Sequence, residues 1–491
     1  MSLELHPQQD KRYTRIRVHN DDDFQRLYPL ILDYIREPEL ALSVKEFVFR
    51  CHLPHSLISM IGQAQLDALH AAENARDISQ EHSIFQKVTD LGIEGLERSR
   101  WVRALTWMKP GLVAARTGGF DVGAFYNHYN KIFAHHAAAL LLLLCPNIEV
   151  LKYEQGSTVV EDILCRNNYG LLPSQYLQKL RDVTLLPTDN FILGDTRFYV
   201  NMDILAMLRL FHRLPAIESV SVDAVGPHFD AGYISHFPPA TSNLKRIYVG
   251  HSMHGTDVIG TLIGVPKRLE EFTFTTGGRA SSDGGYALTF AETIGKALYS
   301  HKSSLRKIDL DIDEHIIGKE SFYDDEDDDE YDSEEEDKDE WYERDMEIST
   351  APAQAENTRE YGGTIGSMHD FESLTHLSIG IKVLLGGSSP DSNVADAPFR
   401  LAEALPKSLE YLLIRGYERG KVAQYDAKID EFLASKQDHF PVLKEVHGID
   451  KTIPSAVSIR SPDESYDQLW RPEISDEEWM EAPGSTGSEE R

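Results

Sequence analysis

The chain has 491 residues, and 41% of them are hydrophobic, which is enough apolar material for one large core or two ordinary ones. Its 49 Lys and Arg stand against 80 Asp and Glu, which gives a formal net charge of −31. A field of this sign repels nucleic acid and anionic membranes, so we expect neither as a direct ligand.

The three cysteines are too few for a disulfide framework, and no CxxC pair offers a structural zinc site. We expect them to be small core residues in a reducing compartment. The first ten residues are polar and carry no apolar signal segment. The most apolar run, Ala137–Leu144, is far shorter than the roughly 20 residues that a membrane span needs. The sequence therefore predicts a cytoplasmic or nuclear protein.

A short pattern, apolar-x-x-apolar-x-apolar, recurs along the chain. Its last two apolar residues alternate around one polar position, as in a strand that buries one face. The copies are Val44/Phe47/Phe49, Ile148/Leu151/Tyr153, Leu180/Val183/Leu185, Ile217/Val220/Val222, Leu244/Ile247/Val249, Leu269/Phe272/Phe274, Leu305/Ile308/Leu310, Leu374/Leu377/Ile379 and Leu409/Leu412/Ile414, and Leu443/Val446 begins a tenth. The spacing of the copies suits one strand and one helix per unit.

Segments that precede several copies have the pattern of an amphipathic helix followed by a turn. They are Ala137–Leu144, Met202–Leu214, Phe290–His301 and Pro398–Leu405. One strand and one helix cannot bury the apolar face alone, whereas stacked units form a continuous core. The fold class that we predict is therefore α/β: an irregular leucine-rich-repeat solenoid, with a curved parallel sheet inside and helices outside. The alternative is an ordinary α/β domain.

The predicted repeat domain covers residues 24–453, after an N-terminal flank at 1–23. We expect a helical insertion at 51–136 and a disordered acidic insertion at 318–366. Within the latter, residues 324–345 hold sixteen acidic and two basic residues, a net charge of 2 − 16 = −14. Residues 454–491 form a predicted disordered acidic tail. Its Trp470 and Trp479 would either anchor a partner or dock the tail on its own domain.

Two segments resemble a broad group of fungal F-box and leucine-rich-repeat-like proteins. They are Leu27–Phe49 (LYPLILDYIREPELALSVKEFVF) and residues 141–153 (LLLLCPNIEVLKY). The resemblance extends over roughly 13–450 and implies a protein-binding, substrate-adaptor-like role. In that group an F-box precedes the first unit, whereas here only residues 1–23 precede Phe24. The F-box-like stretch Leu53–Ile58 follows the first strand instead, so the resemblance does not imply a ubiquitin-ligase role.

No enzyme signature is present, neither a phosphate-binding glycine loop nor a zinc-protease or serine-hydrolase motif. We therefore predict a chain without catalytic activity and without a cofactor. Two sets of residues suggest a metal site, His135-His136 and the group His251, His254 and Asp257. The first two histidines point about 100° apart on a helix. Polar loop residues explain the second set, so no metal is predicted.

Polar strand positions beside the buried ones are the candidate binding residues, because they would face the concave side of the sheet. These are Lys152, Arg246, Tyr248, Lys307, Asp309, His376, Tyr411 and Arg415. The partner would be an unidentified protein, although some of these residues would be plain solvated positions. Alternatively, the acidic run binds histones or other basic proteins. Acidic residues follow Ser333 and Ser475, which makes both candidate phosphorylation sites. An enzyme of unrecognised type is the third hypothesis.

Overall fold

The computed structural model describes residues 12–50, 81–109, 122–187, 198–227, 237–279, 289–313, 363–386, 398–455 and 477–483, and positions 71, 78, 281 and 361. The chain divides into two compact units. Unit 1 comprises Met1–Gly194, Ala206–Glu218 and Glu473–Arg491, and unit 2 comprises Asp195–Leu205 and Ser219–Pro472. The C-terminal segment therefore belongs to the same unit as the N-terminus.

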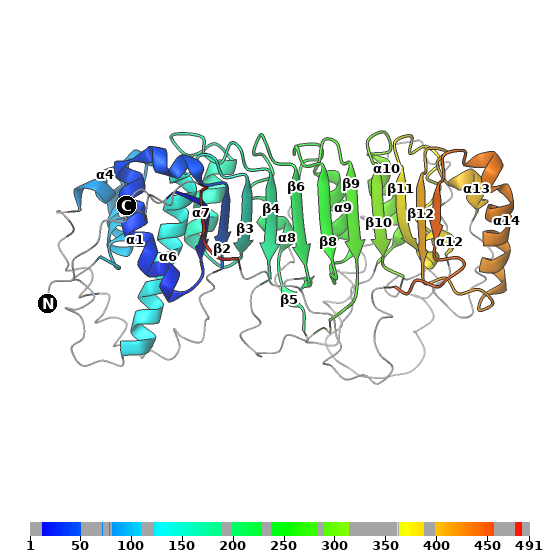
Figure 1. The fold of residues 1–491 in the computed structure, drawn as a ribbon, viewed down its shortest axis with the longest axis horizontal. Coiled ribbons are helices and arrows are strands. Elements are labelled where there is room, and N and C mark those ends of the chain that lie inside the picture. Colours follow the sequence, from blue (N-terminus) through cyan, green and yellow to red (C-terminus); the bar gives the residue numbers. More distant parts are fainter. Residues whose placement is uncertain are drawn as a thin grey trace, which may run out of the picture. The chain divides into compact units, whose positions relative to one another are not determined.

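The sheet of unit 1 is parallel except at one edge (Figure 1). Its strands are β1 (Tyr13–Val18), β2 (Glu46–Phe49), β3 (Val150–Glu154), β4 (Asp182–Leu186) and β14 (Met480–Glu481). They follow the order β14-β1-β2-β3-β4, and β14 is antiparallel to β1. Its helices are α1 (Asp21–Arg36), α4 (His82–Asp90), α5 (Gly95–Leu105), α6 (Val122–Leu144) and α7 (Thr158–Asn168), with the 3-10 helix η1 (Pro38–Ser43).

Helix α1 begins where it does because Asn20 caps it. The Asn20 side chain accepts a hydrogen bond from the Asp23 backbone N–H at 3.0 Å, and the Asp23 carboxylate accepts one from the Asn20 N–H at 3.4 Å. Together these two bonds satisfy amides that the helix leaves unpaired. Three acidic residues in the first turn, Asp21, Asp22 and Asp23, also suit the positive end of the helix dipole.

In unit 2 seven of the described strands form one parallel sheet (Figure 1). In order these are β6 (Ser219–Asp223), β8 (Arg246–Gly250), β9 (Glu271–Thr275), β10 (Lys307–Asp311), β11 (His376–Gly380), β12 (Tyr411–Arg415) and β13 (Glu445–His447). A separate parallel pair joins β5 (Val200–Asn201) to β7 (Val225–Gly226). The helices are α9 (Thr256–Gly264), α10 (Ala291–Tyr299), α12 (Ile381–Leu385), α13 (Leu401–Ala404) and α14 (Ala423–His439), while the short α8 (Ile204–Leu208) crosses the boundary between the units.

The core confirms the repeated apolar pattern. The three apolar residues of each of the nine complete copies are buried, with exposed fractions of 3% or less. In the incomplete tenth copy, Leu443 is buried and Val446 is half-buried. All ten copies lead into or contain a strand that pairs in parallel with a neighbour in its own unit. The expected curvature of the sheet stays a prediction.

A repeated backbone hydrogen-bond arrangement marks the start of seven strands, β3, β4 and β9 to β13. The carbonyl oxygen of Arg306 accepts the N–H groups of Thr375 at 3.0 Å and His376 at 3.1 Å. The same two-donor arrangement recurs at the carbonyls of Lys45, Glu149, Lys245, Glu270, Thr375 and Glu410. The same backbone hydrogen bonds in successive repeats are what a stack of equivalent repeats requires.

Described strands or buried residues lie inside three of the ranges that flank or interrupt the expected repeat domain. The flank at 1–23 contains β1 and the start of α1. Within the range expected to be disordered, the Ile365 N–H donates to the Val383 carbonyl at 3.0 Å, and Ile365 is buried. The tail expected to be disordered contributes β14. The acidic run 324–345, Ser333, Ser475, Trp470 and Leu53–Ile58 lie outside the described residues.

Candidate binding surface

The polar positions of the unit 2 strands line up in rows, because the strands are parallel and in register. The first row places Arg246, Glu271, Lys307, His376, Tyr411 and Glu445 side by side. The second row holds Tyr248, Thr273, Asp309, Ser378, Leu413 and His447. Side chains in these rows share one face, opposite the buried residues. We call the two rows together with Arg415 the open face.

Seven of the eight residues predicted from the sequence lie on this face of unit 2. Lys152 does not, because it belongs to β3 in unit 1. There its ammonium group lies 3.5 Å from Glu46 Oε1 and forms an ion pair with Glu477. Lys152 thus lies between two carboxylates of unit 1.

Arg415 connects three neighbouring strands. Its Nε donates to the Ser378 hydroxyl at 3.1 Å, and its Nη2 lies 3.4 Å from Asp309 Oδ1. The buried carboxylate of Asp311 is 3.9 Å from the Arg415 Nε. The guanidinium of Arg415 on β12 is therefore held in one orientation by groups on β10 and β11, and it compensates two carboxylates of β10.

A strip of aromatic rings crosses β11, β12 and β13. The rings of His376 and Tyr411 are stacked, with centroids 5.8 Å apart and an interplanar angle of 22°. The His447 ring lies 5.3 Å from that of Tyr411. His376 and His447 are exposed, and Tyr411 is half-buried. Rigid rings at the surface offer contact area at a low cost in side-chain entropy.

Tyr248 is the large aromatic residue at the β8 side of the open face, and it is 39% exposed. Its hydroxyl and the Asp223 carboxylate crowd around Gly250, where an added Cβ would lie 2.5 Å and 2.6 Å from them. Partial burial, with Asp223 and Asp309 nearby, raises the pKa of Tyr248 to about 12. Tyr248 therefore remains a neutral phenol at physiological pH, able to donate and accept hydrogen bonds.

The structure adds a buried carboxylate that the sequence did not point to. Asp313 follows β10, is 5% exposed, and accepts the backbone N–H groups of Lys382 and Val383 at 3.1 Å each. Burial raises its pKa to about 6, although these two hydrogen bonds oppose the shift. Asp313 thus caps α12. Gly380 is the residue of the sequence that could have indicated this contact. A Cβ at position 380 would lie 1.9 Å from Asp313 Oδ1, so the close approach requires glycine.

The histidines considered for a metal site bind separate protein groups. His251 Nδ1 lies 3.0 Å from Asp223 Oδ1, whereas the buried His254 contacts the Met202 carbonyl at 2.9 Å. On α6, the His135 ring packs against Phe49 and the His136 ring against Trp101. Within the described part of the chain, no three His, Cys, Asp or Glu residues form a group that could hold a metal ion.

A search for helices that could span a bilayer finds none in the described ranges. Comparison with known proteins gives one result: a family model for a leucine-rich repeat domain matches residues 348–459. No curated protein and no solved structure matches the chain. The matched segment carries β11, β12 and β13 with their helices, and thus the Arg415 contacts to Ser378 and the aromatic strip. This part of the chain is therefore similar to a leucine-rich repeat domain.

Proposed function

We propose that the chain is a non-catalytic protein-interaction scaffold that binds a protein partner through the open face of unit 2. Leucine-rich repeat domains are in general interaction modules, and one matches residues 348–459. The observation that carries the proposal is the aromatic strip of His376, Tyr411 and His447, which presents ring surface beside fixed charges.

The charges on the open face favour a partner whose surface carries both acidic and basic groups. Lys307 is exposed in the same row as Glu271 and His376, whereas Arg415 already compensates Asp309. Salt screens exposed charges of this kind, so they contribute mainly to the association rate and to the choice of partner. The aromatic strip would contribute most of the affinity.

The test begins with affinity capture on the full chain, followed by binding measurements with each purified partner candidate. We expect the double variant His376→Ala, Tyr411→Ala to weaken binding at least about tenfold, the effect of losing one strong contact. The matched control is Leu433→Ala, because Leu433 is a similarly exposed hydrophobic residue (38%) on α14 of the same unit. Equal affinities of the double variant and the control would reject the open face as the binding site.

A second candidate function rests on the charge of residues 324–345. A run with a net charge of −14 attracts basic proteins such as histones without a shaped surface. Deleting 324–345 separates the two functions. Loss of partner binding with an intact open face would favour the acidic run, and unchanged binding would favour the open face.

A further inference from the structure

The C-terminal segment Glu477–Ala482 occupies the edge of the unit 1 sheet. Glu481 and Met480 pair with Tyr13 and Arg15 of β1 in antiparallel register, and the Ala482 N–H donates to the Arg12 carbonyl at 2.7 Å. Without β14, β1 would be an edge strand of the sheet in the described part of unit 1. Edge strands accept extended peptides through their free backbone groups.

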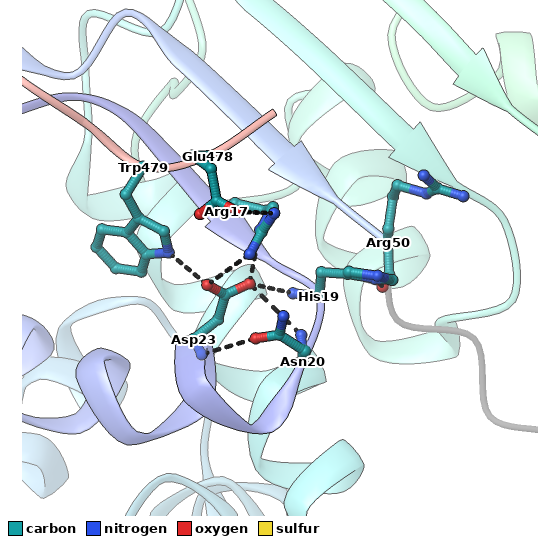
Figure 2. Close-up of polar contacts among 7 residues, drawn as sticks. All are labelled: Arg17, His19, Asn20, Asp23, Arg50, Glu478 and Trp479. Carbon is teal, nitrogen blue, oxygen red and sulfur yellow. Dashed lines mark hydrogen bonds and ion pairs between the residues drawn. The ribbon is translucent and has the colours of Figure 1, made fainter. Parts of the chain in front are cut away.

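Trp479 is the anchor of this segment (Figure 2). Its indole N–H donates to Asp23 Oδ1 at 2.8 Å, and its ring meets the Tyr13 ring edge-on at 4.9 Å between centroids. The Arg26 guanidinium lies over the indole at 4.3 Å. One indole thus receives a hydrogen-bond acceptor, an aromatic contact and a cation–π contact, which together recognise tryptophan rather than a generic apolar side chain.

The two residues before Trp479 meet cations. Glu478 Oε1 lies 3.2 Å from Arg17 Nη1, and Glu477 forms an ion pair with Lys152. Three consecutive residues, Glu-Glu-Trp, therefore each have a partner of complementary chemistry in unit 1. We call the surface formed by Tyr13, Arg17, Asp23, Arg26 and Lys152 the tail site.

The contact between the segment Glu477–Ala482 and the rest of unit 1 is small. The strand β14 has only two residues, and its register against β1 is irregular. The Glu478 side chain is 71% exposed and Met480 is 46% exposed. Short pairing with much exposed surface has a low local opening free energy. The covalent connection through residues 456–476 raises the effective concentration of the segment at the site.

We propose that the tail site is a peptide-binding site for extended sequences with two acidic residues followed by tryptophan, and that the chain's own Glu477–Ala482 is its tethered competitor. A partner protein that presents this sequence binds by displacing the tail. The tail site consists of residues of unit 1 and the open face of residues of unit 2, so each proposal is tested by its own variants.

The experiment releases the C-terminal segment from the folded full chain by proteolysis. A protease recognition sequence is introduced within residues 456–476 of the full chain, and binding of a fluorescent peptide of residues 473–483 is followed by anisotropy. We expect the cut protein, after removal of the released fragment, to bind the peptide at least about tenfold more tightly than the uncut protein, because the tethered competitor is gone. A peptide with Trp479→Ala should not bind.

Two variants of the protein test whether the peptide binds at the tail site. Arg26→Ala, introduced into the cleavable chain, removes the cation over the indole and should weaken peptide binding. The matched control Arg36→Ala should not, because Arg36 lies at the other end of α1 with a side chain that is 68% exposed. Cut protein that binds neither peptide, or both equally, overturns the proposal.

A second measurement covers the case in which cutting unfolds unit 1. In the uncut chain, Trp479→Ala weakens the tethered competitor, so the wild-type peptide should bind this variant more tightly than it binds the wild-type chain. Equal peptide binding by the two uncut chains also overturns the proposal.

Discussion

The Asp23 carboxylate and the Arg17 guanidinium form a buried ion pair in unit 1, with Arg17 Nε 2.9 Å from Asp23 Oδ2. Their side chains are only 2% and 5% exposed. The same carboxylate accepts the His19 N–H at 3.0 Å and the indole N–H of Trp479 at 2.8 Å (Figure 2). Asp23 thus joins β1, the start of α1 and the C-terminal segment.

The first prediction concerns this carboxylate. In Asp23→Ala the buried Arg17 cation would lose the carboxylate that lies 2.9 Å from its Nε, and α1 would lose part of its cap. Removing one partner of a buried pair costs about 3–5 kcal/mol of unfolding free energy. Urea denaturation should show this loss. Asp22→Ala, one residue earlier and exposed, should change stability by less than about 0.5 kcal/mol. Equal stability of the two variants would contradict the role of Asp23.

The second prediction uses two adjacent residues of β9 that point to opposite faces. Phe272 is fully buried, whereas Glu271 is exposed in the first row of the open face. Phe272→Ala should cost about 3–5 kcal/mol, because truncating a buried aromatic ring leaves a cavity. Glu271→Ala should be close to neutral by the same denaturation measurement. A large loss in both variants would show that the two faces are not distinguished as described.

The burial of these strands could be predicted from the sequence because the signal is local. The alternation that places Ile247 and Val249 in the core, with Tyr248 between them, lies within three residues. In β1, by contrast, the charged Arg15 and Arg17 obscure the alternation. Arg17 is buried next to the carboxylate of Asp23, which compensates it from the following helix. That dependence on a partner is not visible in a strand pattern.

The candidate site could be predicted only in part, for a related reason. The pattern identified Asp309 and Arg415 as residues of the same face, but they are 106 positions apart and contact each other only because β10, β11 and β12 are in register. Lys152 fits the same pattern equally well. Its place in unit 1 and its pairing with Glu477, which is 325 positions away, are not visible in that pattern.

The third prediction concerns acid lability. Burial lowers the pKa of His254 to about 4, although a hydrogen bond to the Met202 carbonyl opposes the shift. Because this folded-state pKa lies below the ordinary value of 6.5, the unfolded chain binds the proton more tightly. The stability that His254 contributes is complete above pH 6.5 and is lost as the pH falls through about 4.

Urea unfolding at a series of pH values checks this expectation. Between pH 6.5 and 4, the unfolding free energy of His254→Gln should fall less steeply than that of the wild-type protein, because glutamine does not titrate. Parallel slopes for the two proteins would show that His254 does not carry the effect. Asp313 acts in the opposite direction. Its folded pKa of about 6 exceeds the ordinary 3.8, so protonation as the pH falls through this window favours the folded state.

The last prediction concerns the close approach of Gly380 and Asp313. A Cβ at position 380 would lie 1.9 Å from Asp313 Oδ1, and that carboxylate is held by two backbone N–H groups of α12. Gly380→Ala should therefore cost about 1–3 kcal/mol, the usual penalty for overpacking. Gly264→Ala is the matched control, because among the described residues no atom beyond its chain neighbours and its own helix backbone lies within 4 Å of a Cβ at this end of α9.

A double-mutant cycle distinguishes this collision from general strain in the backbone. In an Asp313→Ala background the collision is absent, so the additional substitution Gly380→Ala should cost clearly less than it does in the wild-type chain. Such a difference is the coupling energy expected of residues in direct contact. If Gly380→Ala costs the same in both backgrounds, the glycine is required for a reason other than room for the carboxylate that caps α12.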